Sequence, residues 1–226
     1  GKEDDDISNS FFINKPLGVI YGYKQNGIVQ ETDADYMAAN GVKAGTPKYV
    51  DLDNDGKITT ADRTILGYKS PNFKLNISNT FTYKNIDLYV MLAGTFGGSN
   101  YYMQSNMWAY MTNGSGLFNS NGIYIPYWTP ENKSNKYTSA TFSGDGRFLG
   151  LQNRGFVRVQ DITLSYTFRE HWVKQAGLGA LKVFLSGKNL GTFTNWDGAD
   201  PETGAGVNNG TYPVLTSFTL GANVSF

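Results

Sequence analysis

The 226-residue sequence contains no cysteine and only one histidine. Disulfides and thiolate chemistry are therefore excluded, and a histidine-rich metal site or a Ser-His-Asp arrangement is disfavoured. The single histidine, His171, is predicted to be a turn residue. Lysine plus arginine and aspartate plus glutamate number 19 each, so the chain lacks the basic excess that nucleic-acid binding normally requires.

Long apolar runs are also missing: no stretch approaches the roughly 18 consecutive apolar residues of a transmembrane helix. Transmembrane strands alternate in polarity and escape this test, so a membrane location stays open. The chain begins "GKEDDDISNS", without methionine or an apolar signal region, and is read as either a processed or an internal start. The acidic run Asp4–Asp6 is predicted to be a solvated loop.

Alternation of apolar and polar residues is the strongest pattern that is present. In "NFKLNISNTFTYK", Phe73, Leu75, Ile77, Phe81 and Tyr83 share one side of a predicted strand. The same pattern predicts an antiparallel all-β fold of about six strands. Their ranges are 16–24, 73–83, 86–97, 156–168, 181–193 and 214–226. Lys84 and Asn85 form the turn of a hairpin between the second and third of them.

The connections between these strands differ strongly in length. One end of the sheet has connections of about 2 and 12 residues, and the other has about 58 and 19, which is typical of outer-membrane barrels with short periplasmic turns and long extracellular loops. Strands of about 11–13 residues also suit a bilayer better than a soluble domain. Six strands cannot close a barrel, and an open edge cannot face lipid, so the chain is predicted to be one piece of a larger barrel.

Several segments resemble SusC/RagA-type TonB-dependent transporters of the Bacteroidetes outer membrane, from about residue 16 to Phe226. They are "YVDLDNDGKITTADRTILGYKSPNFKLNISNTFTYKNIDL", "GFVRVQDITLSYTF", "KNLGTFTNWDGADPE" and the alternating strand that ends at Phe226. Their order and spacing make the resemblance specific. Arg169 departs from it, because family members often carry proline after that strand.

The resemblance implies a 22-stranded barrel with a plugged lumen. It also implies an outer-membrane importer of oligosaccharides or peptides, with a SusD-like surface lipoprotein as a lid and TonB as the energy source. Residues 1–226 would be the C-terminal part of the barrel and would contact the remaining strands, the plug and lipid. The plug domain has no match in this chain, so the chain alone is not expected to be a working transporter. We also predict that it is not an enzyme.

The stretch "DLDNDGKITTAD", residues 51–62, fits a loop of the EF-hand type that binds Ca²⁺ in a structural role. Asp51, Asp53 and Asp55 stand at positions 1, 3 and 5, and Gly56 permits the sharp turn. Lys57 would offer its carbonyl, Thr59 would act through water, and Asp62 would close the site in place of the usual glutamate. The alternatives are a solvated Asp-Gly turn and a pair of glycosidase carboxylates, the second disfavoured because the loop spacing uses all four acids.

Aromatic residues of the long loops are candidate substrate contacts, because their faces can stack on sugar rings or pack against a lid protein. The candidates are Trp108, Tyr110, Trp128 and Trp196. Packing within the loops is the alternative. A second aromatic group, Tyr83, Tyr166, Phe168 and Phe226, is predicted to form an interfacial girdle near the periplasmic strand ends.

A competing class of protein is a soluble, calcium-stabilised, carbohydrate-binding β-sandwich. The apolar side of the strands discriminates between the two: it would face lipid in a barrel and would be buried in a sandwich.

Overall fold

The structure is a computed structural model that describes residues 4–101, 126–142, 150–198, 200–203 and 214–226. Most elements in these ranges are strands, and the helices are few and short. None of the described helices has the length and apolarity needed to cross a membrane. The chain divides into two compact units, each built from three separate segments. The loop unit comprises Gly1–Pro71, Gly97–Arg154 and Trp196–Tyr212, and the sheet unit comprises Asn72–Phe96, Gly155–Asn195 and Pro213–Phe226.

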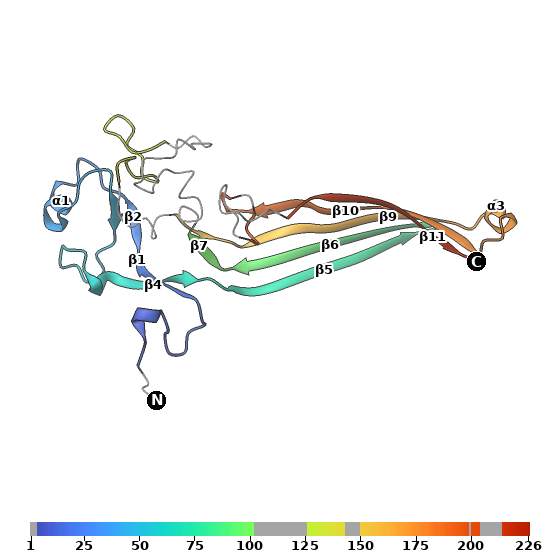
Figure 1. The fold of residues 1–226 in the computed structure, drawn as a ribbon, viewed down its shortest axis with the longest axis horizontal. Coiled ribbons are helices and arrows are strands. Elements are labelled where there is room, and N and C mark those ends of the chain that lie inside the picture. The colour runs from blue at the N-terminus through green and yellow to red at the C-terminus, as the bar shows by residue number, and fades with distance from the viewer. Residues whose placement is uncertain (1–3, 102–125, 143–149, 199, 204–213) are drawn as a thin grey trace. The chain divides into compact units, whose positions relative to one another are not determined.

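The sheet unit is a five-stranded sheet in the order β11-β10-β9-β6-β5, and its strands lie side by side in Figure 1. The strands are between 9 and 15 residues long, well above the roughly 5–6 residues usual in globular proteins. Their bounds are β5 (Pro71–Tyr83), β6 (Ile86–Gly97), β9 (Phe156–Phe168), β10 (Ala180–Thr194) and β11 (Ser217–Ser225). β9 pairs antiparallel with both β6 and β10, and β10 pairs antiparallel with β11.

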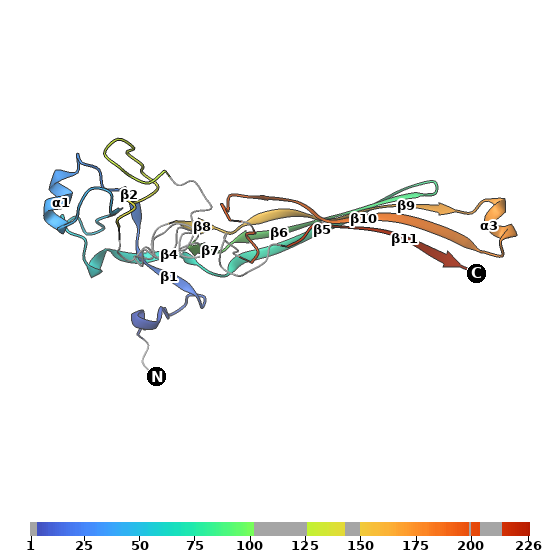
Figure 2. The ribbon, with the colours of Figure 1, turned by 45° about the horizontal axis from the view of Figure 1, so that its top comes forward.

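The connections of this sheet follow the expected asymmetry. Lys84 and Asn85 form the turn between β5 and β6, with Lys84 in the left-handed region at φ 54°. The β9–β10 connection contains the short helix α3 (His171–Gln175), so His171 starts a helix within the predicted linker (Figure 2). At the opposite end, residues 98–155 separate β6 from β9 and residues 195–216 separate β10 from β11.

The strand predicted over residues 16–24 exists as β1 (Val19–Tyr23), but it does not belong to this sheet. It pairs antiparallel with β4 (Arg63–Tyr68) inside the loop unit. β1 is only five residues long, and both of its faces are buried or half-buried, so it lacks the one-sided alternation of the long strands. The described sheet therefore has five strands, and a closed barrel of 22 strands stays a prediction.

An irregularity at Gln160 changes which β9 side chains share a face. Asp161 lies opposite Met91 of β6, whereas Val159 lies opposite the very next residue, Leu92, so Gln160 has no partner on β6. The register with β10 also shifts at this level, between Lys188 and Gly191. A bulge of this kind moves the following side chains to the other face. Val157 and Val159 consequently join the apolar side, and Phe156 and Arg158 the polar side.

The loop unit is held by a small core. This core is mainly aromatic. Ile28, Trp128 and Trp196 are buried together, and Tyr127, Tyr137 and Phe142 pack against them. Gly45 lies against the indole of Trp128 with φ +84°, and a Cβ there would come within 2.6 Å of the ring. The remaining elements are η1 (Ile7–Asn9), β2 (Gln25–Ile28), α1 (Ala34–Asn40), β3 (Pro47–Tyr49), η2 (Thr60–Asp62), β7 (Ser99–Tyr101) and β8 (Leu151–Asn153).

Candidate functional site

In the central strands β9 and β10, the two faces of the sheet have the reverse of the exposure found in a soluble sheet. Leu164, Leu185 and Leu220 lie in one cross-strand row, and they are 51%, 52% and 76% exposed. On the opposite face, Ser165 is 4% and Arg158 is 2% exposed. Removal of a leucine side chain from water normally stabilises a protein by about 1.5–3 kcal/mol, so an aqueous sheet would bury the leucines first.

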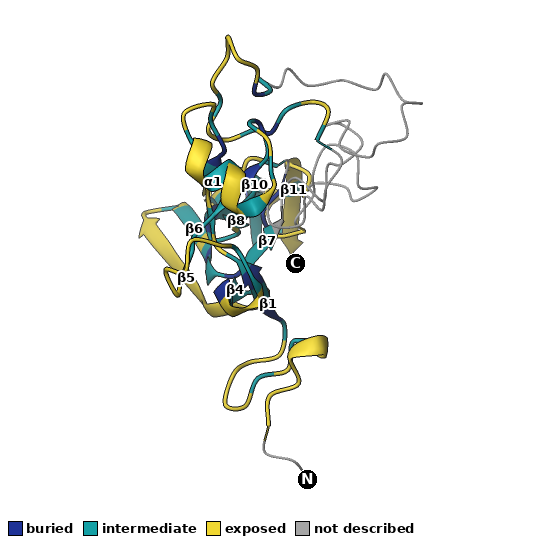
Figure 3. Ribbon diagram, turned by 90° about the vertical axis from the view of Figure 1, so that its left-hand side faces the viewer, coloured by how far each residue is buried: buried dark blue, intermediate teal, exposed yellow. Residues whose placement is uncertain are grey.

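This apolar face extends over all five strands. The register places Leu88 of β6 beside Leu164. Leu88 therefore extends the row formed by Leu164, Leu185 and Leu220. β5 is exposed along its entire length, as the yellow ribbon in Figure 3 shows, and Ile77 there is 57% exposed. The described residues of the sheet unit form no second sheet.

Aromatic side chains gather at both ends of the apolar face. Near the long connections, the rings of Phe73 and Phe96 stack with centroids 4.6 Å apart. Near the short connections, the ring of Phe168 meets those of Tyr166 and Trp172 at centroid distances of 4.5 and 5.6 Å. Tyr83 and Phe226, the other members of the predicted girdle, are 69% and 95% exposed and lie at or next to strand ends of the same side.

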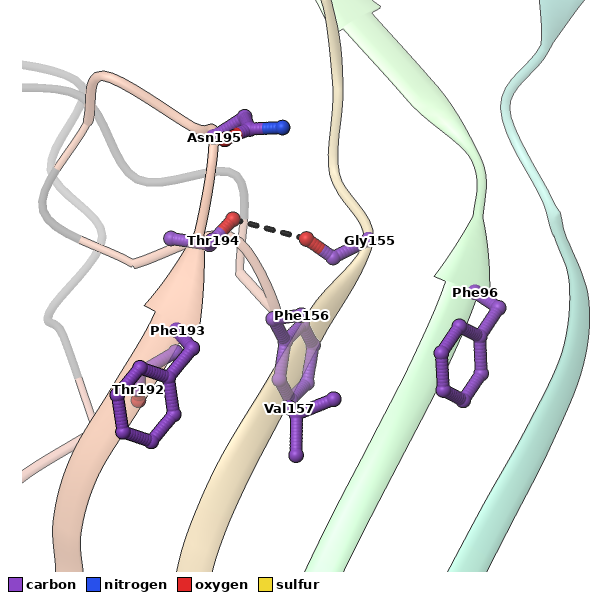
Figure 4. A pocket seen from close by; sticks show the side chains of 8 residues that line it. All are labelled: Phe96, Gly155, Phe156, Val157, Thr192, Phe193, Thr194 and Asn195. Carbon is purple, nitrogen blue, oxygen red and sulfur yellow. Dashed lines mark hydrogen bonds between the residues drawn. The ribbon is translucent and has the colours of Figure 1, made fainter.

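A hollow of about 590 Å³ lies at the end of the sheet where the long connections leave (Figure 4). Phe96, Val157 and Phe193 line it from three different strands. The Thr194 hydroxyl at its rim donates a hydrogen bond to the Gly155 carbonyl at 2.8 Å. Rings beside a few polar groups make a surface suited to an amphipathic boundary between lipid and water.

The polar face carries charged side chains, and several of them have ion-pair or hydrogen-bond partners. Lys182 Nζ contacts Asp87 Oδ2 at 3.0 Å, and the Thr82 hydroxyl donates to Asp87 Oδ1 at 2.8 Å. Further along, Arg158 Nε donates to Thr192 Oγ1 at 3.0 Å. Buried charges need such partners because an unpaired charge away from water is strongly destabilising. The arrangement suits a water-lined interior such as a barrel lumen.

The structure brings three of the predicted metal ligands together. One carboxylate oxygen from each of Asp51, Asp53 and Asp55 lies within 4.8 Å of the others. Asp51 accepts hydrogen bonds from the amides of Asn54 and Gly56 at 2.6 and 2.8 Å, which folds the loop around it. Partial removal from water and the Asp55 carboxylate raise the pKa of Asp53. Crowded acids with amide-fixed oxygens form a donor set that suits a hard cation.

The later half of the predicted loop is engaged in helix capping. Asp62 is fully buried, and its two oxygens accept hydrogen bonds from the amides of Leu52 and Thr59 at 2.6 and 2.7 Å. These amides hold the pKa of Asp62 below its usual value. Thr59 closes a capping box with Asp62 at the start of η2. Lys57 donates its amide to Asp55 Oδ1 at 2.7 Å. The metal role of Lys57, Thr59 and Asp62 stays a prediction.

The candidate substrate contacts fall into two groups. Trp108 and Tyr110 lie outside the described residues. Trp128 and Trp196 are 8% and 5% exposed in the core of the loop unit, and the Trp128 indole donates to Gln30 Oε1 at 2.9 Å. Both tryptophans therefore pack within the loops, which was the alternative interpretation. A contact of either tryptophan with substrate stays a prediction.

Sequence reasoning missed two anchoring residues of the loop unit. Arg154 donates hydrogen bonds to the carbonyls of Pro201 and Glu202, and Asp197 accepts from Lys136 Nζ at 3.0 Å and Gln152 Nε2 at 2.8 Å. Arg154 stands directly before the motif segment "GFVRVQ", and Asp197 lies within the motif segment "NWDGADPE". That proximity was the available signal, but the partners are distant in sequence and no local pattern connects them.

Comparison with known proteins points to one class, the TonB-dependent receptors. No family model matches the sequence. "TonB-dependent receptor P3" of Formosa agariphila is 29% identical over 93% of this chain and 22% of its own length. "TonB-dependent receptor SusC" of Bacteroides thetaiotaomicron is 29% identical over 79% of this chain and 17% of its own length.

Solved structures agree in fold. The RagAB peptide importer in its "open-open" state superposes with a TM-score of 0.67 at 22% identity, covering 92% of this chain and 22% of the importer chain. The chain spans about a fifth of the length of these relatives. These findings confirm the resemblance to part of a SusC/RagA-type TonB-dependent transporter. The relatives are receptors and importers, and this confirms the prediction that the chain is not an enzyme.

Proposed function

We propose that this chain forms part of the wall and the outer loops of a SusC-like, TonB-dependent importer in a bacterial outer membrane. The observation that carries the proposal is the reversed exposure of the sheet, with leucines outside and serine and arginine covered. Lipid is the solvent in which this arrangement is stable, because an apolar surface incurs no cost there and a polar lumen stays hydrated.

The height of the apolar face supports this location. Tyr83 and Phe73, both exposed ring-bearing residues of β5, are ten positions apart, which corresponds to roughly 33 Å at about 3.3 Å per residue. A strand tilted by about 40° would bring this to roughly 25 Å, the height of the apolar band between the aromatic girdles of outer-membrane barrels.

The two unpaired edges of the described sheet indicate that further strands of the transporter would pair with it. Among the described residues, β5 and β11 each pair on one side only. An unpaired strand edge inside lipid would leave amides and carbonyls without partners, so further strands of the transporter would cover both edges. The soluble sandwich is not favoured, because it would need a second sheet over the apolar face.

The substrate would be an oligosaccharide or a peptide. One relative is named SusC and another is the RagAB peptide importer, and this chain resembles both along most of its length. By that resemblance the long connections would line the substrate entrance below a SusD-like lipoprotein, and the plug and the TonB contact would come from elsewhere in the transporter. Trp108 and Tyr110 stay candidates for contact with the substrate or the lid.

Calcium would have a structural role in the outer loops. Asp51, Asp53 and Asp55 would supply carboxylates, with the Lys57 carbonyl, Thr59 through water and Asp62 completing the shell. The ion would neutralise the crowded acids and pin residues 51–62. Limited proteolysis of the full transporter tests this: chelation is expected to open cleavage between about residues 50 and 65. An Asp53→Asn/Asp55→Asn variant should be cleaved equally with and without chelator, and a wild type insensitive to chelation would refute the site.

Mass spectrometry of the detergent-extracted complex from outer-membrane fractions tests the whole proposal. We expect this chain within a protein several times larger, or together with the pieces that close the barrel. A stable species of 24.9 kDa that stays in solution without detergent would refute the importer. It would support the soluble, calcium-stabilised, carbohydrate-binding β-sandwich.

A further inference from the structure

The apolar face carries a groove near the short connections of the sheet. Its volume is about 350 Å³, and its lining is almost wholly apolar. Its lining includes the cross-strand row of Leu164, Leu185 and Leu220. Tyr166, which lies opposite Val183, and Phe168 line it nearer to the short connections. The groove arises because two small side chains lie next to the leucine row: Val183 of β10 lies opposite Ala222 of β11. It is therefore a depression in a surface that otherwise consists of larger side chains.

Basic residues neighbour the aromatic end of the groove in the sequence. Arg169 directly follows the groove residue Phe168, Lys174 lies on α3, and Lys84 occupies the turn before Ile86, another lining residue. All three basic residues are exposed. Arg169 and Lys174 make no side-chain hydrogen bond or ion pair with the part of the chain that the structure describes. The acidic residue of this region, Glu170, accepts a hydrogen bond from the Tyr166 hydroxyl at 3.4 Å.

We propose that this groove binds one acyl chain of an anionic phospholipid, whose phosphate lies against Arg169 and Lys174. The proposal rests on the membrane location proposed above. An apolar trough whose aromatic end is followed along the chain by exposed cations suits a lipid with a hydrocarbon tail and a negative headgroup. Trp172 is half-exposed beside Phe168, and an indole at this level suits the boundary between tail and headgroup.

The dimensions favour a lipid chain over a protein segment. A helix with its side chains is about 10–12 Å wide, too broad for a depression of about 350 Å³. An acyl chain is a slender, flexible hydrocarbon that fits such a groove. The short connections of outer-membrane barrels face the periplasm, so the ligand would come from the phospholipids of the inner leaflet.

Native mass spectrometry of the detergent-solubilised full transporter tests the site. Phosphatidylglycerol and phosphatidylethanolamine with identical acyl chains would be added separately, and the retained lipid would be counted. The wild type is expected to retain phosphatidylglycerol more strongly. Val183→Trp, which fills the groove, is expected to reduce retention of both lipids to background, whereas Ile77→Trp, on the same face but outside the groove, should leave retention unchanged.

The headgroup contact is tested by Arg169→Gln/Lys174→Gln. Each basic side chain near an anionic lipid is worth about a fivefold change in affinity, so this variant should lose about thirtyfold for phosphatidylglycerol and little for phosphatidylethanolamine. Lys43→Gln/Lys133→Gln removes the same charge from the loop unit and should change neither.

Three results would overturn the inference: equal retention by Val183→Trp and Ile77→Trp, a charge variant that keeps the preference for phosphatidylglycerol, or a retained mass that matches detergent or a peptide. A chain that is absent from the outer-membrane fraction would instead refute the proposed function, so the two failures are distinguishable.

Discussion

The loop unit and the sheet unit place the same kinds of side chain in opposite environments. In the loop unit, Trp128 and Trp196 are buried, and the acidic loop residues Asp53 and Asp55 are exposed. In the sheet unit, Leu220 is exposed and Arg158 is covered. The loop unit follows the rule for proteins in water, where burial of apolar surface drives folding.

The difference shows that the exposure of a side chain is informative only with respect to its solvent. Leucines that would be an aggregation hazard in water are ordinary on a surface bathed in hydrocarbon. With the sheet unit in the proposed membrane location, the two units of this chain would follow opposite rules of burial. The variants below separate these rules, beginning with the largest expected effect.

Trp128→Ala should break the aqueous core. The indole packs with Ile28 and against Gly45, and removal of a buried aromatic side chain costs about 3–5 kcal/mol. Hydrogen exchange of the Gly45 and Ser139 amides, which donate to Val29 and Gly45 carbonyls, should accelerate. Leu52→Ala, at a 43% exposed position of the same unit, is the control. Similar exchange in both variants would mean that Trp128 does not hold this core.

Ile162→Arg should break the apolar face. The residue lies mid-strand in β9 opposite Val90 and Gly187, and an arginine at the bilayer midplane of a barrel costs about 2–4 kcal/mol. The amount of folded transporter in the outer membrane should fall, measured on gels as the band whose mobility changes when the sample is heated. Thr163→Arg, one residue further on and on the polar face, should assemble nearly normally. Equal loss in both variants would contradict the assignment of the two faces.

Acidification and Asp33→Asn should both loosen the loop unit. The Gln30 amide and Lys48, at 2.8 and 2.7 Å, hold the pKa of Asp33 below its usual value. The folded pKa is depressed, so this stabilisation is complete above the unfolded pKa of about 3.9 and is lost as pH falls below it. Asp33→Asn is expected to cost about 1–3 kcal/mol at pH 7.

Protease sensitivity of residues 30–50 measured from pH 7 to pH 3 would show this. The exposed neighbour Asp35 is the control, and Asp35→Asn should behave as wild type at every pH. Wild-type protection that persists unchanged to pH 3 would contradict the role of the Asp33 carboxylate.

Lys182→Met should produce the smallest change. Its ion pair with Asp87 is partly exposed, with side-chain exposures of 39% and 29%, and such pairs contribute about 0–1 kcal/mol. A loss of at most this size in unfolding titrations would fit a hydrated lumen, with Lys74→Met on β5 as the matched control. A loss several times larger would indicate a dry interior behind the polar face and would revise the comparison.

Local sequence patterns predicted the long strands well, because alternation is a property of neighbouring residues. The turn at Lys84 and Asn85 was predicted from the same pattern and is present. The switch of faces at Gln160 was not predictable, since a bulge is defined by the register with Leu92 and Gly191 on other strands. The pairing of β1 with β4 also depends on residues that are 40 to 49 positions apart.

The residues of the candidate site also differ in whether a local sequence pattern could predict their positions. The clustering of Asp51, Asp53 and Asp55 follows from spacing alone and is present. The burial of Trp128 depends on Gln30, 98 residues away, so composition could nominate the tryptophan but could not place it. The contacts of Arg154 with Pro201 and Glu202 are of this second kind.

The exposed leucine row has a consequence for how such a sequence can diverge. A side chain buried in a protein core has fixed neighbours, so a change of one methylene is felt. In the proposed membrane location, Leu164, Leu185 and Leu220 would face a fluid that adapts to any apolar shape, so exchange among leucine, valine, isoleucine and phenylalanine there should be nearly neutral. Selection on this surface would preserve polarity at alternate positions while identities drift.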